Sequence, residues 1–200
     1  MADLPLDLGA ALADRLARAL DVEGKIPRVL EAVGGRDVVL VDGAAGIRAG
    51  QLADLGARVT AVDSAGEQPF DAPDASADAI VACWSAFRGD APDEIAQAER
   101  ILRPGGRLLV VHDYGRDDVS LVRGVRPEYG TWSRRNGPFL GRGFKIRALH
   151  CFWTFDSMED LSGFLHEAFG DAGLLVADSH KRPRLSYNVA IYHRAVGAAA

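Results

Sequence analysis

A glycine-containing turn followed by an acid is the part of this sequence whose residue types and spacing best suit ligand binding. The turn is Asp42-Gly43-Ala44-Ala45-Gly46, and the acid is Asp63. Glycine lets the backbone approach a ligand at a helix N-terminus, and an acid about 20 residues further on can accept hydrogen bonds from a ribose. These residues predict a site for a nucleotide-like cofactor.

The stretch from Val38 to Asp63 also predicts the elements that position this turn. We expect a strand over 37–41, a helix over 47–55 and a second strand over 58–62. The first strand is an unbroken apolar run, which is typical of a parallel strand buried on both faces.

Strands and helices alternate through the rest of the chain. We expect an amphipathic helix over 6–20, a short helix over 27–33, a strand over 78–83, a helix over 91–102 capped by Asp90, a strand over 107–112 after the turn Pro104-Gly105-Gly106, and a helix over 157–169. Segments 174–179 and 187–193 are interpreted as an antiparallel hairpin. The pattern predicts an α/β fold: a Rossmann-like, doubly wound, mostly parallel sheet with a C-terminal antiparallel hairpin.

Composition narrows the classes of protein. The 200 residues are 48% hydrophobic and contain no linker-like stretch, so we expect a single domain over 1–200. The two cysteines, Cys83 and Cys151, lack metal-ligand spacing, which disfavours a disulfide framework or a metal site and favours a cytoplasmic location. We expect no export signal and no membrane span. The net charge of −5 disfavours nucleic acid as a partner but allows a local basic patch.

With these elements in place, the chain resembles the class I S-adenosylmethionine-dependent methyltransferases from about Leu30 to its end. Four stretches carry the resemblance: VVLVDGAAG with GARVTAVD, DASADAIVACW, AERILRPGGRLLVV, and the terminal YNVAIYHR. The segment RILRPGGRLLVV is the most specific of them, although a helix stop and a tight turn into a buried strand explain its proline and glycines as well.

The resemblance implies S-adenosylmethionine as the cofactor. By position, Gly43, Ala44 and Gly46 would pack against its methionine part and Asp63 would hold its ribose, while the end of the strand at 78–83 would border the methyl group. The implied cofactor-binding set is Asp42, Gly43, Ala44, Gly46, Asp63, Ser64, Cys83 and Trp84. For Cys83, a space-filling role is the alternative.

The resemblance also implies that His112, Asp113 and Tyr114 face the substrate. His112 or Asp113 could deprotonate an acceptor, and Tyr114 could orient it. The alternative for His112 is a hydrogen-bonded histidine at a strand end, which is the favoured interpretation.

The chain departs from the family pattern in two places. Its glycine turn matches only in part, and only 15 residues, SAGEQPFDAPDASAD, connect the second strand to the next one. We therefore expect the usual helix and third strand to be absent, 58–62 to become an edge strand, and one wall of the adenine pocket to be lost. Asp71 or Asp74 could substitute from the loop, but solvated turn residues are the favoured interpretation.

Residues 115–154 form a long, basic and aromatic insert, which we interpret as a cap. Between Arg116 and Arg147 it carries eight Lys and Arg against three Asp and Glu, and FKIRALHCFWTF within it reads as a strand. Three interpretations stay open: a solvated lid or dimer-forming strand whose aromatics only pack, a surface for a small anionic or aromatic substrate, or a nucleic-acid surface. Arg134 and Arg135 are the candidate substrate-binding residues.

The sequence thus favours a methyltransferase that acts on a small molecule mainly by positioning the reactants. The alternative is a degenerate methyltransferase fold that serves as a binding or regulatory domain without this activity. A nicotinamide-dependent oxidoreductase is disfavoured because the turn lacks G-x-G-x-x-G. A homodimer is left open.

Overall fold

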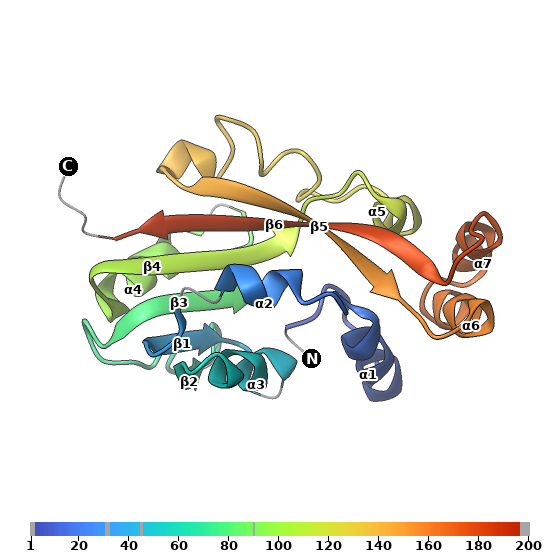
Figure 1. Cartoon of the computed structure of the whole chain (residues 1–200). Helices are drawn as coiled ribbons and strands as arrows, with labels where there is room; N and C mark the ends of the chain where they lie inside the picture. Colours follow the sequence, from blue (N-terminus) through green and yellow to red (C-terminus); the bar gives the residue numbers. More distant parts are fainter. Residues whose placement is uncertain (1–2, 31–32, 45, 90, 197–200) are drawn as a thin grey trace.

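The computed structural model describes residues 3–30, 33–44, 46–89 and 91–196 (Figure 1). Within these residues, six strands form one sheet in the order β2-β1-β3-β4-β6-β5. The first four strands of this order are parallel: β2 (Arg58–Val62), β1 (Asp37–Val41), β3 (Ala77–Cys83) and β4 (Leu102–Asp113). The last two are antiparallel: β6 (Arg184–Ala195) and β5 (Lys145–Thr154).

Apolar side chains cover both faces of the sheet. One face packs against α1 (Ala10–Ala19), α2 (Lys25–Leu30), α3 (Ile47–Asp54), α5 (Asp118–Arg123), α6 (Met158–Phe169) and α7 (Asp171–Asp178). The other packs against α4 (Pro92–Ile101), the loop 63–76 and the segment 124–144 with its short 3₁₀ helix η2 (Leu140–Arg142). This is a doubly wound α/β fold, as predicted. None of the helices in the described part of the chain has the length and apolar character needed to cross a membrane.

The strands around the glycine turn are confirmed. Both 37–41 and 58–62 are strands with the expected bounds, and β1 is buried along nearly its whole length between β2 and β3. The helix predicted over 47–55 ends one residue earlier, and the helix over 91–102 is α4, with Ala91 as its N-cap. The expected cap, Asp90, lies outside the described residues.

As predicted, no further strand lies between β2 and β3 in the sequence, where every residue is described, and β2 forms the edge of the sheet. Loop 63–76 contains neither helix nor strand, but it is held in place. Arg100 on α4 donates to the carbonyl oxygens of Phe70 (3.1 Å) and Ala72 (2.8 Å), and it pairs with Asp74 (2.6 Å). Asp74 therefore anchors the loop rather than facing the carboxyl edge.

The predicted C-terminal hairpin is wrong in one of its strands. Residues 174–178 belong to α7, and β6 pairs with β5 over ten residues instead. Gly170, with φ of 62°, ends α6 and lets the chain turn directly into another helix. The insert's FKIRALHCFWTF segment is a strand, as predicted, but it lies in the main sheet, where Cys151 and Trp153 are buried.

Two element starts differ from prediction by four residues or more. The first helix begins at Ala10, because residues 3–8 run over the sheet edge as an irregular segment with Leu4 in the core. Strand β4 begins at Leu102 rather than 107. The turn Pro104-Gly105-Gly106 lies within β4, where the pairing with β3 shifts register as in a β-bulge.

The contact between α6 and α7 generates a stability prediction. A Cβ atom at Gly173 would lie 2.1 Å from the carbonyl oxygen of Leu165, which is backbone and cannot swing away. We expect Gly173→Ala to lower the free energy of unfolding by about 2–3 kcal/mol, measured by urea denaturation.

The matched control for this substitution is Gly163→Ala in α6. A Cβ there meets only the end of the flexible Arg15 side chain, at 3.8 Å. We expect this variant to be as stable as wild type or up to about 1 kcal/mol more stable. Equal losses in both variants would contradict the close approach at Gly173.

Candidate functional site

The carboxyl ends of the parallel strands border a cavity of about 600 Å³, which we call the first cavity. Asp42 lies at the end of β1, with a φ of 55°. Its carboxylate accepts hydrogen bonds from the backbone N–H and the hydroxyl of Ser64, both at 2.7 Å. Because Ser64 follows β2, this pair of bonds fixes the ends of two neighbouring strands. Ser85, Arg88 and Glu94 line the opposite side.

Asp63, the predicted ribose ligand, does not line this cavity. Its side chain is exposed at the sheet edge, and its backbone oxygen accepts a hydrogen bond from Phe70 N–H at 2.8 Å. On the β1 and β2 side of the cavity the bordering acid is Asp42, and the predicted Ser64 lies beside it, while Asp93 and Glu94 line the α4 side.

The glycine turn holds a carboxylate of the chain itself. A Cβ atom at Gly46 would lie 1.9 Å from an oxygen of Asp3, so only glycine admits this approach. The same Asp3 oxygen, Oδ2, accepts a hydrogen bond from the backbone N–H of Arg48 at 2.9 Å, in the first turn of α3. A helix N-terminus attracts anions, and Asp3 exploits this although it lies over 40 residues away in sequence.

The other residues of the turn have lesser roles in this arrangement. Gly43 packs closely on Leu40, whose Cδ2 would be 2.6 Å from a Cβ there. Ala44 is exposed.

A buried arginine connects this turn to the end of β3. The Arg48 side chain is 1% exposed, and its guanidinium lies 5.5 Å from the ring centroid of Trp84. Within the described residues, its Nε and Nη2 atoms have no hydrogen-bond partner. Trp84 itself has a φ of 54°, an unfavourable value for a bulky residue, so its neighbours must hold it there.

Asp113 is the group that holds Trp84. The indole Nε1 of Trp84 donates to its Oδ1 at 2.9 Å, and the Tyr187 hydroxyl donates to the same oxygen. Arg123 pairs with Oδ2, and both members of this ion pair are almost fully buried. Burial raises the pKa of Asp113, and the nearby Arg123 opposes that rise. All these bonds make Asp113 an anchor between strands.

The three predicted catalytic residues do not converge. His112 and Asp113 are neighbours in β4, so their side chains point to opposite faces of the sheet. His112 lies against Trp132, with ring centroids 4.9 Å apart, and burial lowers its pKa to about 3. Tyr114 is half-buried beside Arg116.

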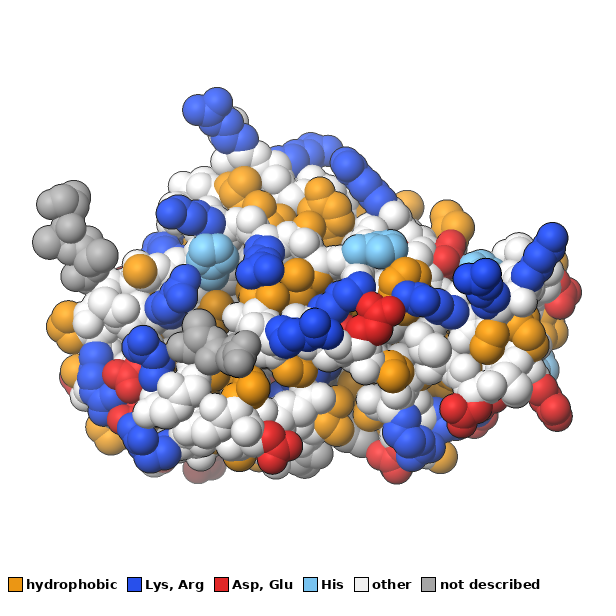
Figure 2. Space-filling model, in the orientation of Figure 1, with side chains coloured by type: hydrophobic (Ala, Val, Ile, Leu, Met, Phe, Trp, Pro, Cys, Tyr) orange, Lys and Arg blue, Asp and Glu red, His pale blue; other side chains and the backbone are white. Residues whose placement is uncertain are grey.

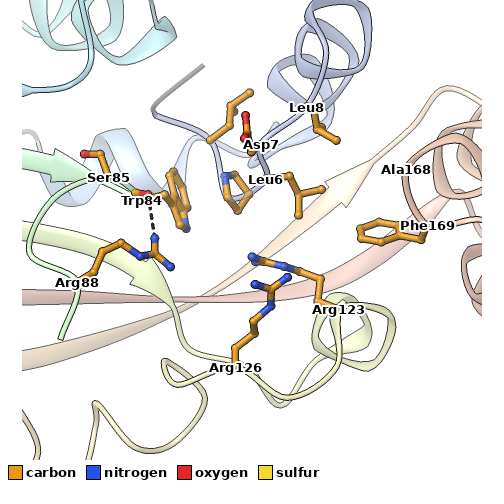
Figure 3. A pocket seen from close by; sticks show the side chains of 12 residues that line it. Leu6, Asp7, Leu8, Trp84, Ser85, Arg88, Arg123, Arg126, Ala168 and Phe169 are labelled. Carbon is orange, nitrogen blue, oxygen red and sulfur yellow. Dashed lines mark hydrogen bonds between the residues drawn. The ribbon is translucent and has the colours of Figure 1, made fainter. Parts of the chain in front are cut away.

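A second cavity of about 710 Å³ lies next to the first (Figure 3). It is bounded by residues 4–8, the loop after β3, and the ends of α5 and α6. Its polar side consists of Arg88, Arg123 and Arg126. Ser85 and Arg88 line both cavities, so the two share a wall.

The remaining predicted residues lie elsewhere. Burial raises the pKa of the Cys83 thiol to about 12, which suits a space-filling side chain. Arg134 and Arg135 are exposed and line a separate cavity of about 560 Å³ on the segment before η2. In Figure 2, Lys and Arg side chains spread over the β5 side of the molecule with few acids among them. No His, Cys, Asp and Glu group suited to a metal ion occurs in the described part of the chain.

Sequence reasoning missed Asp3, Arg48 and Arg88. No local pattern marks Asp3, because its partner is distant in sequence. Arg48 comes a few residues after the end of β1, and Arg88 a few residues after the end of β3. Ligands bind at the carboxyl ends of such strands, so this position is the signal that could have identified both residues.

Comparisons with known proteins agree with this fold. No model of a known protein family matches the chain, and no curated protein sequence does. Among solved structures, a proposed type II methyltransferase from Anaeromyxobacter dehalogenans is 19% identical, with a TM-score of 0.56 over 85% of this chain and 94% of that one.

Two further solved structures are similar over most of their length. A chain in the complex of the Haloferax volcanii Trm112 methyltransferase activator with a proposed methyltransferase is 16% identical (TM-score 0.52; 90% of this chain, 91% of that chain). A proposed methyltransferase from an antibiotic biosynthesis pathway of Anabaena variabilis ATCC 29413 is 12% identical (TM-score 0.51; 88% and 98%). The fold of this chain is therefore a Rossmann-like methyltransferase fold.

The buried His112 generates a prediction for the pH dependence of stability. The unfolded chain takes up a proton near the ordinary pKa of 6.5, whereas folded His112 resists protonation down to about pH 3. Its contribution to stability is thus present above pH 6.5 and is lost as the pH falls, by about 1.4 kcal/mol per pH unit. We expect His112→Leu to remove this slope in urea unfolding between pH 7 and pH 4.5.

His166→Gln is the control for this experiment, because His166 is exposed on α6. It should keep the wild-type slope. A wild-type slope in His112→Leu would show that other groups cause the pH dependence.

Proposed function

We propose that this protein is an S-adenosylmethionine-dependent methyltransferase that acts on a small molecule. The observation that carries the proposal is the shared wall of the two cavities, formed by Ser85 and Arg88 at the carboxyl edge of the sheet. In an open α/β sheet, ligands bind at this edge. One cavity can thus hold a cofactor while the other holds an acceptor in contact with it.

The residues around the first cavity and the turn suit such a cofactor in part. When bound, S-adenosylmethionine supplies a methyl group on a positively charged sulfur, which departs as a neutral thioether. Asp42 and Ser64 present oxygen atoms to the first cavity. Gly46 and the start of α3 already hold the carboxylate of Asp3, so the turn is able to bind a carboxylate such as the one on this cofactor.

The residues of this chain favour catalysis by positioning of the reactants over catalysis by a base. His112 is buried away from both cavities, and its pKa of about 3 makes it a weak base. Asp113 uses its oxygens to bind Arg123, Trp84 and Tyr187. Neither residue is free to accept a proton from an acceptor. The site therefore favours an acceptor that arrives already nucleophilic and needs only orientation and exclusion of water.

A second function is favoured by two other observations. Asp3 occupies the glycine turn, and loop 63–76 replaces the strand that would complete the first cavity. Both features suit a binding or regulatory domain that has kept the fold and uses no S-adenosylmethionine.

Titration calorimetry with S-adenosylmethionine separates these functions. Because Asp3 competes with the cofactor carboxylate for the N-terminus of α3, we expect Asp3→Ala to bind the cofactor about tenfold more tightly than wild type. Asp14→Ala is the matched control, since Asp14 is an exposed acid on α1, and it should bind as wild type does.

The outcomes decide between the two functions. Absence of heat and of a thermal shift with millimolar S-adenosylmethionine and S-adenosylhomocysteine, in wild type and in Asp3→Ala, would exclude the enzyme and favour the binding domain. Binding with equal affinity in Asp3→Ala and wild type would contradict the competition at the turn.

A further inference from the structure

The three arginines of the second cavity differ in whether an acidic side chain neutralises their charge. Arg123 pairs with the buried Asp113, and Arg88 pairs with the buried Glu128 at 2.6 Å. These carboxylates neutralise the two guanidinium groups and fix their positions. Arg126 is exposed and makes no side-chain hydrogen bond or ion pair in the described part of the structure.

The charge of Arg126 is thus available to a ligand. Figure 3 shows the guanidinium groups of Arg123 and Arg126 both directed into the space below Leu6, and Arg88 directed into it from the other end. Among the residues that the structure describes, Asp7 is the only acid that lines this cavity, and its carboxyl end points away from the arginines. Arginine recognises carboxylate and phosphate groups through paired hydrogen bonds, so this side of the cavity suits an oxyanion.

The opposite side of the cavity is apolar. Leu6 and Leu8 come from the N-terminal segment and Phe169 from the end of α6, and all three are half-buried. A wholly polar ligand would leave these side chains in contact with polar groups, whereas an apolar body would remove them from water. The volume of about 710 Å³ is in the range of small-molecule sites.

We propose that the second cavity binds an amphipathic small-molecule anion, with its oxyanion on Arg126 and its apolar body against Leu6, Leu8 and Phe169. This inference rests on the proposed function in one respect, because it makes this anion the methyl acceptor. The arginines predicted from sequence, Arg134 and Arg135, have no part in it. Such an acceptor needs no base, because an oxyanion carries no proton on the attacking oxygen: that oxygen would bond to the methyl carbon as the carbon–sulfur bond breaks, and the sulfur would leave as a neutral thioether.

A matched pair of probes tests the charge requirement. We would measure the binding of 3-phenylpropanoate and of its uncharged amide, 3-phenylpropanamide, by saturation-transfer NMR and calorimetry, without S-adenosylmethionine. We expect the acid to bind at least tenfold more tightly than the amide. Equal affinity would overturn the proposal.

Arginine variants then test which side chain binds the oxyanion. Arg126→Ala should lose at least tenfold in affinity for the acid and keep its affinity for the amide, and Arg126→Lys should recover part of the loss. Arg182→Ala removes an exposed arginine outside this cavity and should leave both affinities unchanged. Unchanged binding of the acid by Arg126→Ala would overturn the proposal, as would displacement of the acid by a short single-stranded oligonucleotide at lower concentration.

Failure of this inference is distinguishable from failure of the methyltransferase function. If S-adenosylmethionine binds and the acid does not, the acceptor class is wrong and the proposed function stands. If the acid binds through Arg126 and the cofactor never does, the cavity is an anion site of a binding protein.

Discussion

The carboxylate of Asp113 lies at the point where the ends of several elements meet. It receives hydrogen bonds from Trp84 after β3 and Tyr187 on β6, and it pairs with Arg123 at the end of α5. Removing one member of a buried ion pair leaves the other uncompensated, which typically costs about 3–5 kcal/mol. The second cavity depends on this group, because Trp84 and Arg123 both line it, and the Trp84 ring also faces the guanidinium of Arg48. Asp113, which the sequence suggests as a catalytic residue, has a structural role here.

Local patterns predicted the centre of the fold well. The run Val38–Val41 is apolar on both faces, which only a central strand explains, and the short, proline-containing link after Asp63 leaves no room for another strand. The C-terminal part was harder. Residues 174–177 are a short apolar run, which fits either a strand or a buried helix. In the structure a new helix begins directly after Gly170, and β6 pairs with β5 over ten residues.

The candidate site was predicted only in part, because local sequence features do not show which distant segments the fold brings together. The glycine turn is a local feature, and the structure uses it to receive an anionic group. The identity of that group, Asp3, depends on a contact between segments that only the tertiary fold brings together. Asp63 directly follows the edge strand β2 and is exposed to solvent, whereas Asp42 and Ser64 turn inward and bond to each other. The relative directions of such side chains follow from packing, which spacing along the chain does not encode.

The N-terminal segment connects the second cavity to the glycine turn. Residues 4–8 form one wall of the second cavity, and Asp3, which directly precedes them, covers the glycine turn. A single displacement of this segment would open both places at once. The second cavity and the turn before α3 are therefore coupled, because whatever moves the N-terminal segment changes both.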